Sequence, residues 1–180
     1  MVKTMPRVPI YFVLAGAAAL AACTPTLGPA PPGGSRPAGS EAFRAQDFAW
    51  STEGGGGGVA GHVSYKQGKV RYSCAKATVI LTPETPWTRR RMRILYLSSE
   101  AAAEPADAVR GRTPSAPGGD YSAYVRRTTC DAGSRFSFHD LPDGAWYAIT
   151  IAKPAAGGGP PIALMKRVTT QNGKVTPVEL

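Results

Sequence analysis

The strongest constraint on the fold of this chain is an alternation of apolar and polar residues that begins at residue 59. Val59, Gly61 and Val63 alternate with Ala60 and His62, and a period of two residues is the spacing of a strand with one buried face. Turn-forming residues interrupt the alternation about every eight to twelve residues, which is typical of short antiparallel strands. Residues 59–180 are therefore predicted to form an all-β sandwich.

The predicted strands are rich in β-branched or aromatic residues, and glycine, proline or asparagine marks their ends. They cover residues 59–65, 69–73, 78–82, 91–96, 121–129, 136–138, 146–151, 162–169 and 175–180. In the fourth of these, Met92, Ile94 and Tyr96 would share one face. Asn172-Gly173 predicts a hairpin between the last two strands, because a type I′ turn needs positive φ at both central residues.

Little helix is expected. Residues 98–120 include the helix-compatible run Ser98-Ser99-Glu100-Ala101-Ala102-Ala103-Glu104. Pro105 would interrupt any long helix there, since proline lacks the backbone N–H that the helix interior uses. The segment is predicted to be a loop with at most one helical turn.

The N-terminus has the pattern of a secretory signal peptide. Lys3 and Arg7 precede an uncharged apolar stretch, residues 8–22, of about fifteen residues, which is short for a membrane span. Its last residues, Leu20-Ala21-Ala22-Cys23, resemble the lipobox of bacterial lipoproteins. That resemblance implies cleavage before Cys23, diacylglycerol on its sulfur and an acyl chain on its new amine. An ordinary signal peptide with an incidental cysteine is the alternative.

The lipobox resemblance also implies a location. Each buried CH₂ of an acyl chain contributes about 0.8 kcal/mol, so three chains would hold the mature protein on a bilayer. The residue after Cys23 is Thr24, not the aspartate that favours inner-membrane retention in enterobacterial lipoproteins. The expected site is the outer membrane of the bacterial cell envelope, with the protein facing the periplasm.

Three segments follow from these patterns: a signal peptide at 1–22, a lipidated cysteine with a disordered Pro/Gly-rich tether at 23–58, and the sandwich at 59–180. The five glycines at 54–58 are expected to be a flexible link, not regular structure. Three aromatic residues lie between the Pro/Gly-rich stretch at 24–37 and these glycines: Phe43, Phe48 and Trp50. These three rings are expected to pack back on the domain, or alternatively to contact a partner.

A family resemblance appears in the second half of the chain. The run from Thr129 to Tyr147, TCDAGSRFSFHDLPDGAWY, resembles the T-x-D-x-x-G-x-F-x-F-x-x-L-P-x-G-x-Y signature of carboxypeptidase-regulatory-like and transthyretin-like (prealbumin-like) domains. The strand at 77–85 is similar to an earlier strand of that fold. The resemblance implies an antiparallel, seven-stranded, Greek-key-type β-sandwich used as a binding, spacer or regulatory module. The stretch between Gly133 and Phe136 is one residue longer than in the tightest versions.

The residues of this signature have structural roles and none is catalytic. Asp131 can cap a turn with its side chain, and Gly133 and Gly144 are suited to left-handed or strained positions. Phe136 and Phe138 are two residues apart and so point into the core together. Tyr147 is expected to re-enter the core after the turn at 141–144.

The cysteines and histidines suggest a disulfide and no metal. With Cys23 lipidated, Cys74 and Cys130 remain as an even pair in an oxidising compartment, so a disulfide is predicted, with two free thiols as the alternative. His62 and His139 lie far from each other and from the cysteines, without zinc-ligand spacing. No metal or other cofactor is predicted.

The sequence favours a non-enzymatic protein. It has no nucleophile elbow, Walker loop or dinucleotide fingerprint. One branch of the transthyretin-like fold hydrolyses 5-hydroxyisourate and ends in Tyr-Arg-Gly-Ser, whereas this chain ends Thr-Pro-Val-Glu-Leu. A hydrolase is therefore the least favoured alternative.

The basic residues offer a candidate binding surface. Lys and Arg number 21 against 12 Asp and Glu, a formal net charge of +9. An arginine cluster beside Trp87, formed by Arg89, Arg90, Arg91 and Arg93, is a possible anion-binding patch. Its expected partners are an anionic envelope polymer, lipid headgroups or an envelope protein, and not nucleic acid, while a solvated strand edge is the alternative.

These observations predict a lipid-anchored β-sandwich that acts as a binding or scaffolding module in the periplasm. The main alternative is a module that binds carbohydrate or another small ligand. Trp87, Trp146 and Tyr124 could offer stacking faces to a sugar if their rings are exposed.

Overall fold

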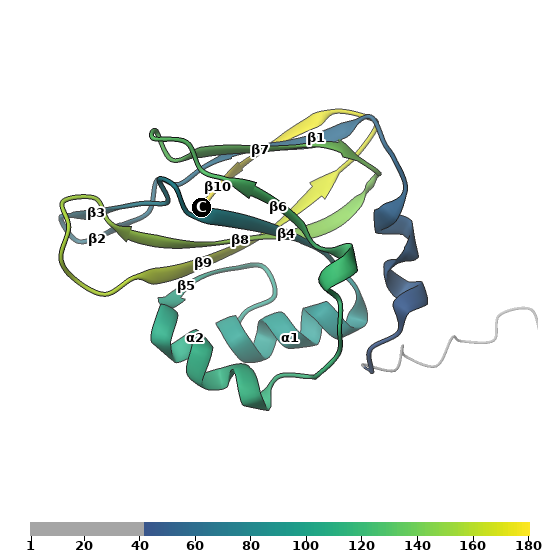
Figure 1. Ribbon diagram of the computed structural model, residues 1–180, viewed down its shortest axis with the longest axis horizontal. Helices are drawn as coiled ribbons and strands as arrows, with labels where there is room; N and C mark the ends of the chain where they lie inside the picture. Colours follow the sequence, from purple (N-terminus) through teal and green to yellow (C-terminus); the bar gives the residue numbers. More distant parts are fainter. Residues whose placement is uncertain (1–41) are drawn as a thin grey trace, which may run out of the picture. The chain divides into compact units, whose positions relative to one another are not determined.

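Two β-sheets pack face to face, and helices cover the outer face of the larger sheet (Figure 1). The computed structural model describes residues 42–180. The predicted signal peptide, Cys23 and the first part of the predicted tether lie outside the described residues.

The described segment contains ten strands and a few short helices. In chain order they are the 3₁₀ helix η1 (Ala45–Thr52), β1 (Gly57–His62), β2 (Lys66–Gln67), β3 (Val70–Ser73), β4 (Thr78–Pro83), α1 (Pro86–Tyr96), β5 (Ala101–Pro105), α2 (Ala106–Arg112), the 3₁₀ turns η2 (Thr113–Ser115) and η3 (Ser122–Tyr124), β6 (Arg126–Thr129), β7 (Arg135–Leu141), β8 (Gly144–Pro154), β9 (Ile162–Thr170) and β10 (Val175–Glu179).

The long strand β8 organises the larger sheet. It pairs with β4 and β3 along one side and with β9 along the other, and β5 extends the sheet beyond β9. Its residues alternate between two cores, as period two requires. Trp146 and Ala148 pack toward the smaller sheet, whereas Tyr147 and Ile149 pack toward the helices.

The smaller sheet has the order β10-β1-β7. Val59, Phe136, Phe138 and Val178 point from it into the core between the sheets, so the predicted alternation in β1 and β7 is confirmed. The all-β sandwich is therefore confirmed. In place of seven strands, residues 42–180 form ten, and β1 pairs with β10 in parallel rather than antiparallel.

The strand predicted at 91–96 is wrong, because these residues complete helix α1. Thr85 and Thr88 form a reciprocal capping box, and Pro86 occupies the first turn, where its missing N–H costs nothing. Met92 and Tyr96 face the sheet as an i, i+4 pair. Because Met92 and Tyr96 are an even number of residues apart, they would also share one face of a strand, so the sequence pattern alone does not distinguish the two structures.

The loop predicted at 98–120 is also wrong. Ala101–Pro105 forms the edge strand β5, paired antiparallel with β9, and α2 follows directly. Pro105 stands at the junction and ends the strand rather than breaking a helix. The strand predicted at 121–129 is shorter than expected, since Ser122–Tyr124 is a 3₁₀ turn and β6 covers only Arg126–Thr129.

The turn predicted at Asn172-Gly173 has the expected backbone, with φ of 57° and 64°. The prediction that the two flanking strands pair as a hairpin is wrong. Strand β9 belongs to the larger sheet, whereas β10 pairs with β1 in the smaller sheet. The tight turn thus passes the chain from one layer of the sandwich to the other.

The ordered domain begins before the predicted boundary at residue 59. Phe48 is fully buried, and the ring of Trp50 lies 4.9 Å from that of Trp146. The aromatic residues therefore pack back on the domain, as expected. The glycines are not a flexible link: Gly57 and Gly58 begin β1, and a Cβ on Gly55 would lie 2.2 Å from the carbonyl oxygen of Leu141.

The signature turn is built only partly by the predicted residues. Asp131 caps it as expected, because its carboxylate accepts the N–H of Arg135 at 2.7 Å. The left-handed position belongs to Ser134, with φ of 60°, and not to Gly133. Gly144 is needed for space, since a Cβ there would lie 2.2 Å from the ring of Trp50. Tyr147 is buried against the helices.

Candidate functional site

A groove of about 300 Å³ opens between the free edges of the two sheets, β5 of the larger and β10 of the smaller. It is at the small end of the size range of ligand pockets. Its lining residues come from β5, β9, the C-terminal segment and the residue before β2: Ala101, Ala102, Ala103, Leu164, Met165, Lys166, Glu179, Leu180 and Tyr65.

Small side chains on β5 create this space. In β9, Leu164 and Lys166 lie on the face that looks toward the smaller sheet, and Ala103 and Ala101 stand opposite them. A methyl group at each position leaves room above the strand that a larger apolar residue would fill. Because β5 is the last strand of the larger sheet, the space opens to solvent.

One wall of the groove is aromatic and firmly held. The ring of Tyr65 is half-buried and lies 5.5 Å from that of Tyr72, edge to face. The N–H of Tyr72 donates to the carbonyl of Tyr65 at 3.0 Å, and the N–H of Ser64 donates to that of Leu180 at 2.8 Å. These backbone bonds fix the ring beside the end of β10.

Two charged residues, Lys166 and Glu179, are also among the lining residues of the groove. The ammonium of Lys166 donates to the backbone carbonyl of Glu179 at 3.1 Å, and the hydroxyl of Ser64 donates to the Glu179 carboxylate. This hydrogen bond, with the charges of His62 and Lys166, holds the pKa of Glu179 below its usual value. The groove thus presents the ammonium of Lys166 and the ring of Tyr65 around an apolar floor, while the Glu179 side chain lies on the same outward face as His62 and is bound by Ser64.

The four arginines of the predicted patch lie on α1, where successive side chains point about 100° apart. Arg89 forms an ion pair with Glu84 at 2.7 Å. Arg91 lies 5.6 Å from the centres of both the Trp87 and Tyr121 rings, and donates to the carbonyl of Pro117 at 2.9 Å. Arg90 and Arg93 are exposed and also have interactions within the protein. At least two of the four guanidinium groups therefore hold the fold together.

The three rings proposed for sugar stacking are not exposed platforms. Trp87 and Trp146 are fully buried, and their indole N–H groups donate to the carbonyl of Gly118 and to the hydroxyl of Thr170. Tyr124 is half-buried and packs 5.0 Å from Phe48. Tyr65 is the aromatic residue that lines the groove, and its sequence surroundings did not single it out.

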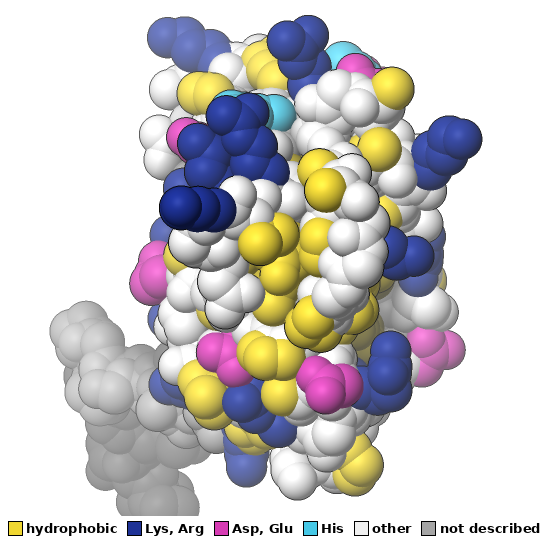
Figure 2. Space-filling model, turned by 90° about the vertical axis from the view of Figure 1, so that its left-hand side faces the viewer, with side chains coloured by type: hydrophobic (Ala, Val, Ile, Leu, Met, Phe, Trp, Pro, Cys, Tyr) yellow, Lys and Arg dark blue, Asp and Glu magenta, His cyan; other side chains and the backbone are white. Residues whose placement is uncertain are grey.

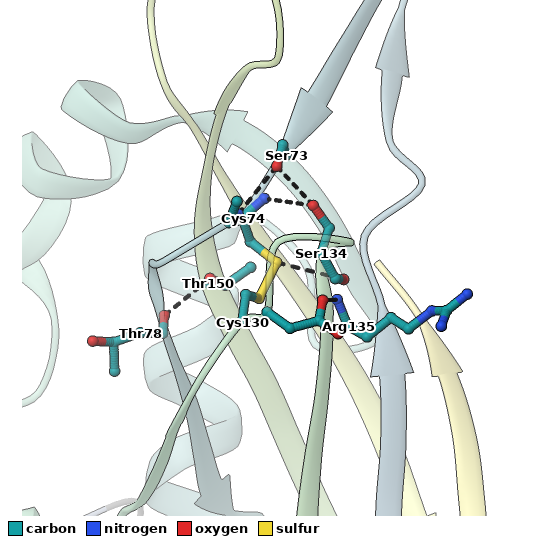
Figure 3. The surroundings of a disulfide bond; sticks show 9 residues. Ser73, Cys74, Thr78, Cys130, Ser134, Arg135 and Thr150 are labelled. Carbon is teal, nitrogen blue, oxygen red and sulfur yellow. Dashed lines mark hydrogen bonds between the residues drawn. A yellow bond between two sulfur atoms is a disulfide. The ribbon is translucent and has the colours of Figure 1, made fainter.

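The disulfide between Cys74 and Cys130 is present (Figure 3). It joins the connection between β3 and β4 to the end of β6. Ser134, in the turn before β7, accepts the N–H of Cys74 and shares a hydrogen bond of 2.7 Å with Ser73. The bridge therefore lies where both sheets meet, and the hydroxyl of Ser134 links the turn before β7 to the segment that follows β3.

The two histidines lie on the outer face of the smaller sheet. His62 ends β1, and the ring of His139 on β7 is 3.1 Å from the hydroxyl of Ser137. Within residues 42–180, no group of three or more His, Cys, Asp or Glu side chains is placed to hold a metal ion. The same part of the chain contains no helix of the length and apolarity that crossing a bilayer requires.

Comparison with known proteins identifies a likeness to a solved structure. No family model matches the chain, and no curated protein sequence matches it. The crystal structure of a "putative carbohydrate binding protein" from Pseudomonas aeruginosa superposes with a TM-score of 0.56. It covers 77% of this chain and 96% of the other at 21% identity, so the likeness shows a shared fold.

Proposed function

We propose that this chain is a non-enzymatic binding module of the bacterial cell envelope, anchored by lipid at Cys23, which takes a neutral carbohydrate in the groove between β5 and β10. The observation that carries the binding role is the groove itself. It combines an apolar floor, the ring of Tyr65 and the ammonium of Lys166.

These groups suit a hydroxyl-rich ligand. An ammonium can donate to sugar hydroxyls, while an aromatic ring covers the apolar face of the sugar. A likeness of fold to a protein named for carbohydrate binding supports the same class of ligand. The proposed ligand is small, because the groove holds about 300 Å³.

The envelope location is supported by two independent features. The lipobox resemblance at residues 20–23 implies export and acylation. The Cys74–Cys130 disulfide is typical of oxidising compartments such as the periplasm. The proposed anchor and the proposed ligand can be tested separately.

For the ligand, Ala101→Trp should weaken carbohydrate binding at least tenfold, because the exposed methyl of Ala101 lines the groove and an indole would fill it. The probe is an array of neutral oligosaccharides that includes chitotriose and maltotriose, followed by calorimetric titration of each sugar retained. Ala123→Trp, on exposed η3 outside the groove, is the matched control and should bind as the unmodified protein does. Failure to retain any sugar, or equal binding by both variants, would contradict the groove as a carbohydrate site.

For the anchor, Cys23→Ser should move the protein from the membrane fraction to the soluble periplasmic fraction, because the substitution removes the thiol that would carry diacylglycerol. Cell fractionation and intact-mass measurement test this, with Thr26→Ser as the control. Persistence of Cys23→Ser in the membrane fraction, or a mature N-terminus other than an acylated Cys23, would rule out the anchor.

A further inference from the structure

One end of the sandwich carries a second, cationic surface. The β2–β3 hairpin and the connection from β8 to β9 lie together there, at the left of Figure 1. Five exposed basic side chains gather at this end and are called the basic tip: Lys66, Lys69, Arg71, Lys76 and Lys153. Figure 2 faces this end and shows basic side chains around a middle of hydrophobic and uncharged groups, with acidic side chains in the lower half and at the sides of the view.

The surface of the basic tip is hollowed. Two cavities of about 410 and 340 Å³ share Pro154 and Ala155 in their walls, so they adjoin. Lys69 and Arg71 line the first, and Lys76 and Lys153 line the second. No acidic residue lines either cavity.

The backbone at the tip holds these cations in place. Ser73 pairs with Lys153 in the β3–β8 ladder, and the N–H of Ala155 donates to the carbonyl of Arg71 at 2.9 Å. Lys76 has a left-handed φ of 62°, and its N–H donates to the carbonyl of Cys130 beside the disulfide. The positions of the charges are therefore set by the sheet and the disulfide rather than by free loops.

The arrangement of charge is unfavourable for folding. Lys66 stands directly opposite Arg71 in the hairpin, and like charges in that position destabilise a pair of strands. Within residues 42–180, none of the five side chains of the tip has an ion pair, whereas Arg89, Arg112 and Arg167 each do. Such a local conflict is expected where a surface serves to bind rather than to stabilise.

We propose that the basic tip binds a linear anionic polysaccharide, whose carboxylates or phosphates contact the lysines and Arg71 while its sugar rings lie in the two adjoining cavities. Exposed Val70 and the walls formed by Pro154 and Ala155 offer apolar contact to the ring faces. Single-stranded nucleic acid would call for stacking rings, and no aromatic side chain lines either cavity.

The test compares polymers that differ in charge. The full chain with Cys23→Ser should bind polygalacturonate, which has a carboxylate on every sugar, or a phosphate-bearing mannan, and should not bind neutral dextran. Which of the two anionic polymers binds tighter identifies the anionic group. Binding should fall between 50 and 500 mM salt, because exposed charges are screened over a few ångströms at high ionic strength.

The decisive variant is Lys69→Glu/Arg71→Glu/Lys153→Glu, which should bind the polymer at least tenfold more weakly. Arg110→Glu/Arg127→Glu/Lys174→Glu changes the net charge equally at exposed positions outside the tip, and should lose less than twofold. Should the first variant fail to fold by circular dichroism, the corresponding glutamine substitutions replace it. Equal losses in both variants, or binding to phosphatidylglycerol vesicles or single-stranded DNA without binding to either polymer, would overturn the proposal.

The two proposed sites can fail independently. Ala101→Trp should leave binding to the anionic polymer unchanged, since the groove and the tip share no lining residue. Loss of polymer binding in Ala101→Trp would show that the basic tip is not a separate site.

Discussion

Replacing Cys74 and Cys130 together by alanine should lower the free energy of unfolding by about 3–4 kcal/mol. The disulfide closes a loop with a sequence separation of 56, and restriction of the unfolded chain by a loop of that length corresponds to a ceiling of about 4 kcal/mol. Cys130 also forms backbone hydrogen bonds with Ala77 and Lys76 that do not involve its sulfur, so the native contacts around the bridge should survive its removal.

Urea unfolding followed by tryptophan fluorescence measures this loss, because Trp87 and Trp146 are fully buried and become exposed on unfolding. Reduction of the unmodified protein with dithiothreitol should reproduce the loss, and the double-alanine variant should not respond to the reductant. A loss below about 1 kcal/mol in both experiments would show that the bridge does not restrict the unfolded state as expected.

The disulfide was predictable because setting Cys23 aside as the predicted acylation site leaves two cysteines in a compartment predicted to be oxidising. Strands with a clear alternation of apolar residues were predictable from the sequence alone. In β8, Trp146 and Tyr147 begin a strict alternation, and each side of the strand meets a different apolar layer. Such a pattern is local in the sequence and is read directly as a strand.

Pairing between distant strands was not predictable. The turn at Asn172-Gly173 has the backbone of a hairpin, yet β10 pairs with β1, more than a hundred residues earlier in the chain. Helix α1 was missed for a different reason. Met92 and Tyr96 satisfy both periods, and the deciding signal is the Thr85–Thr88 capping box that precedes them.

The candidate sites depend most on tertiary structure. Ala101 and Ala103 look like helix formers in the sequence, and they line a groove only because they fall on an edge strand. The lysines of the basic tip lie in separate segments that the β3–β8 ladder brings together, whereas the contiguous arginines of α1 drew attention and are partly used in packing. Clusters along the sequence were thus a poor guide to clusters in space.

Replacing Glu84 by glutamine should lower the free energy of unfolding by about 2–4 kcal/mol at pH 7. The side chain of Glu84 is only 5% exposed and pairs with Arg89 and Arg167 at 2.7 Å each, while the hydroxyl of Tyr147 donates to it at 3.1 Å. Removing one member of a buried ionic cluster costs about 3–5 kcal/mol, and the lower range allows for the partly exposed guanidinium groups. Thermal and urea unfolding measure the loss, with Glu104→Gln as the matched control.

Glu104 pairs with Arg112 at 2.9 Å, but its side chain is 23% exposed and has one arginine partner instead of two, so its substitution should cost less than about 1 kcal/mol. The two variants should also differ in their pH dependence. Burial would raise the pKa of Glu84, but hydrogen bonds and charges from Arg167 and Arg89 outweigh burial and hold that pKa below its ordinary value. A lowered folded-state pKa means that the stabilisation is complete above the unfolded-state pKa of about 4.3 and is lost as the pH falls through the folded-state value. The difference in free energy of unfolding between the unmodified protein and Glu84→Gln should therefore stay constant from pH 8 to about 5.5 and shrink in stronger acid. A difference that grows on acidification would mean that the two arginines do not stabilise the carboxylate of Glu84.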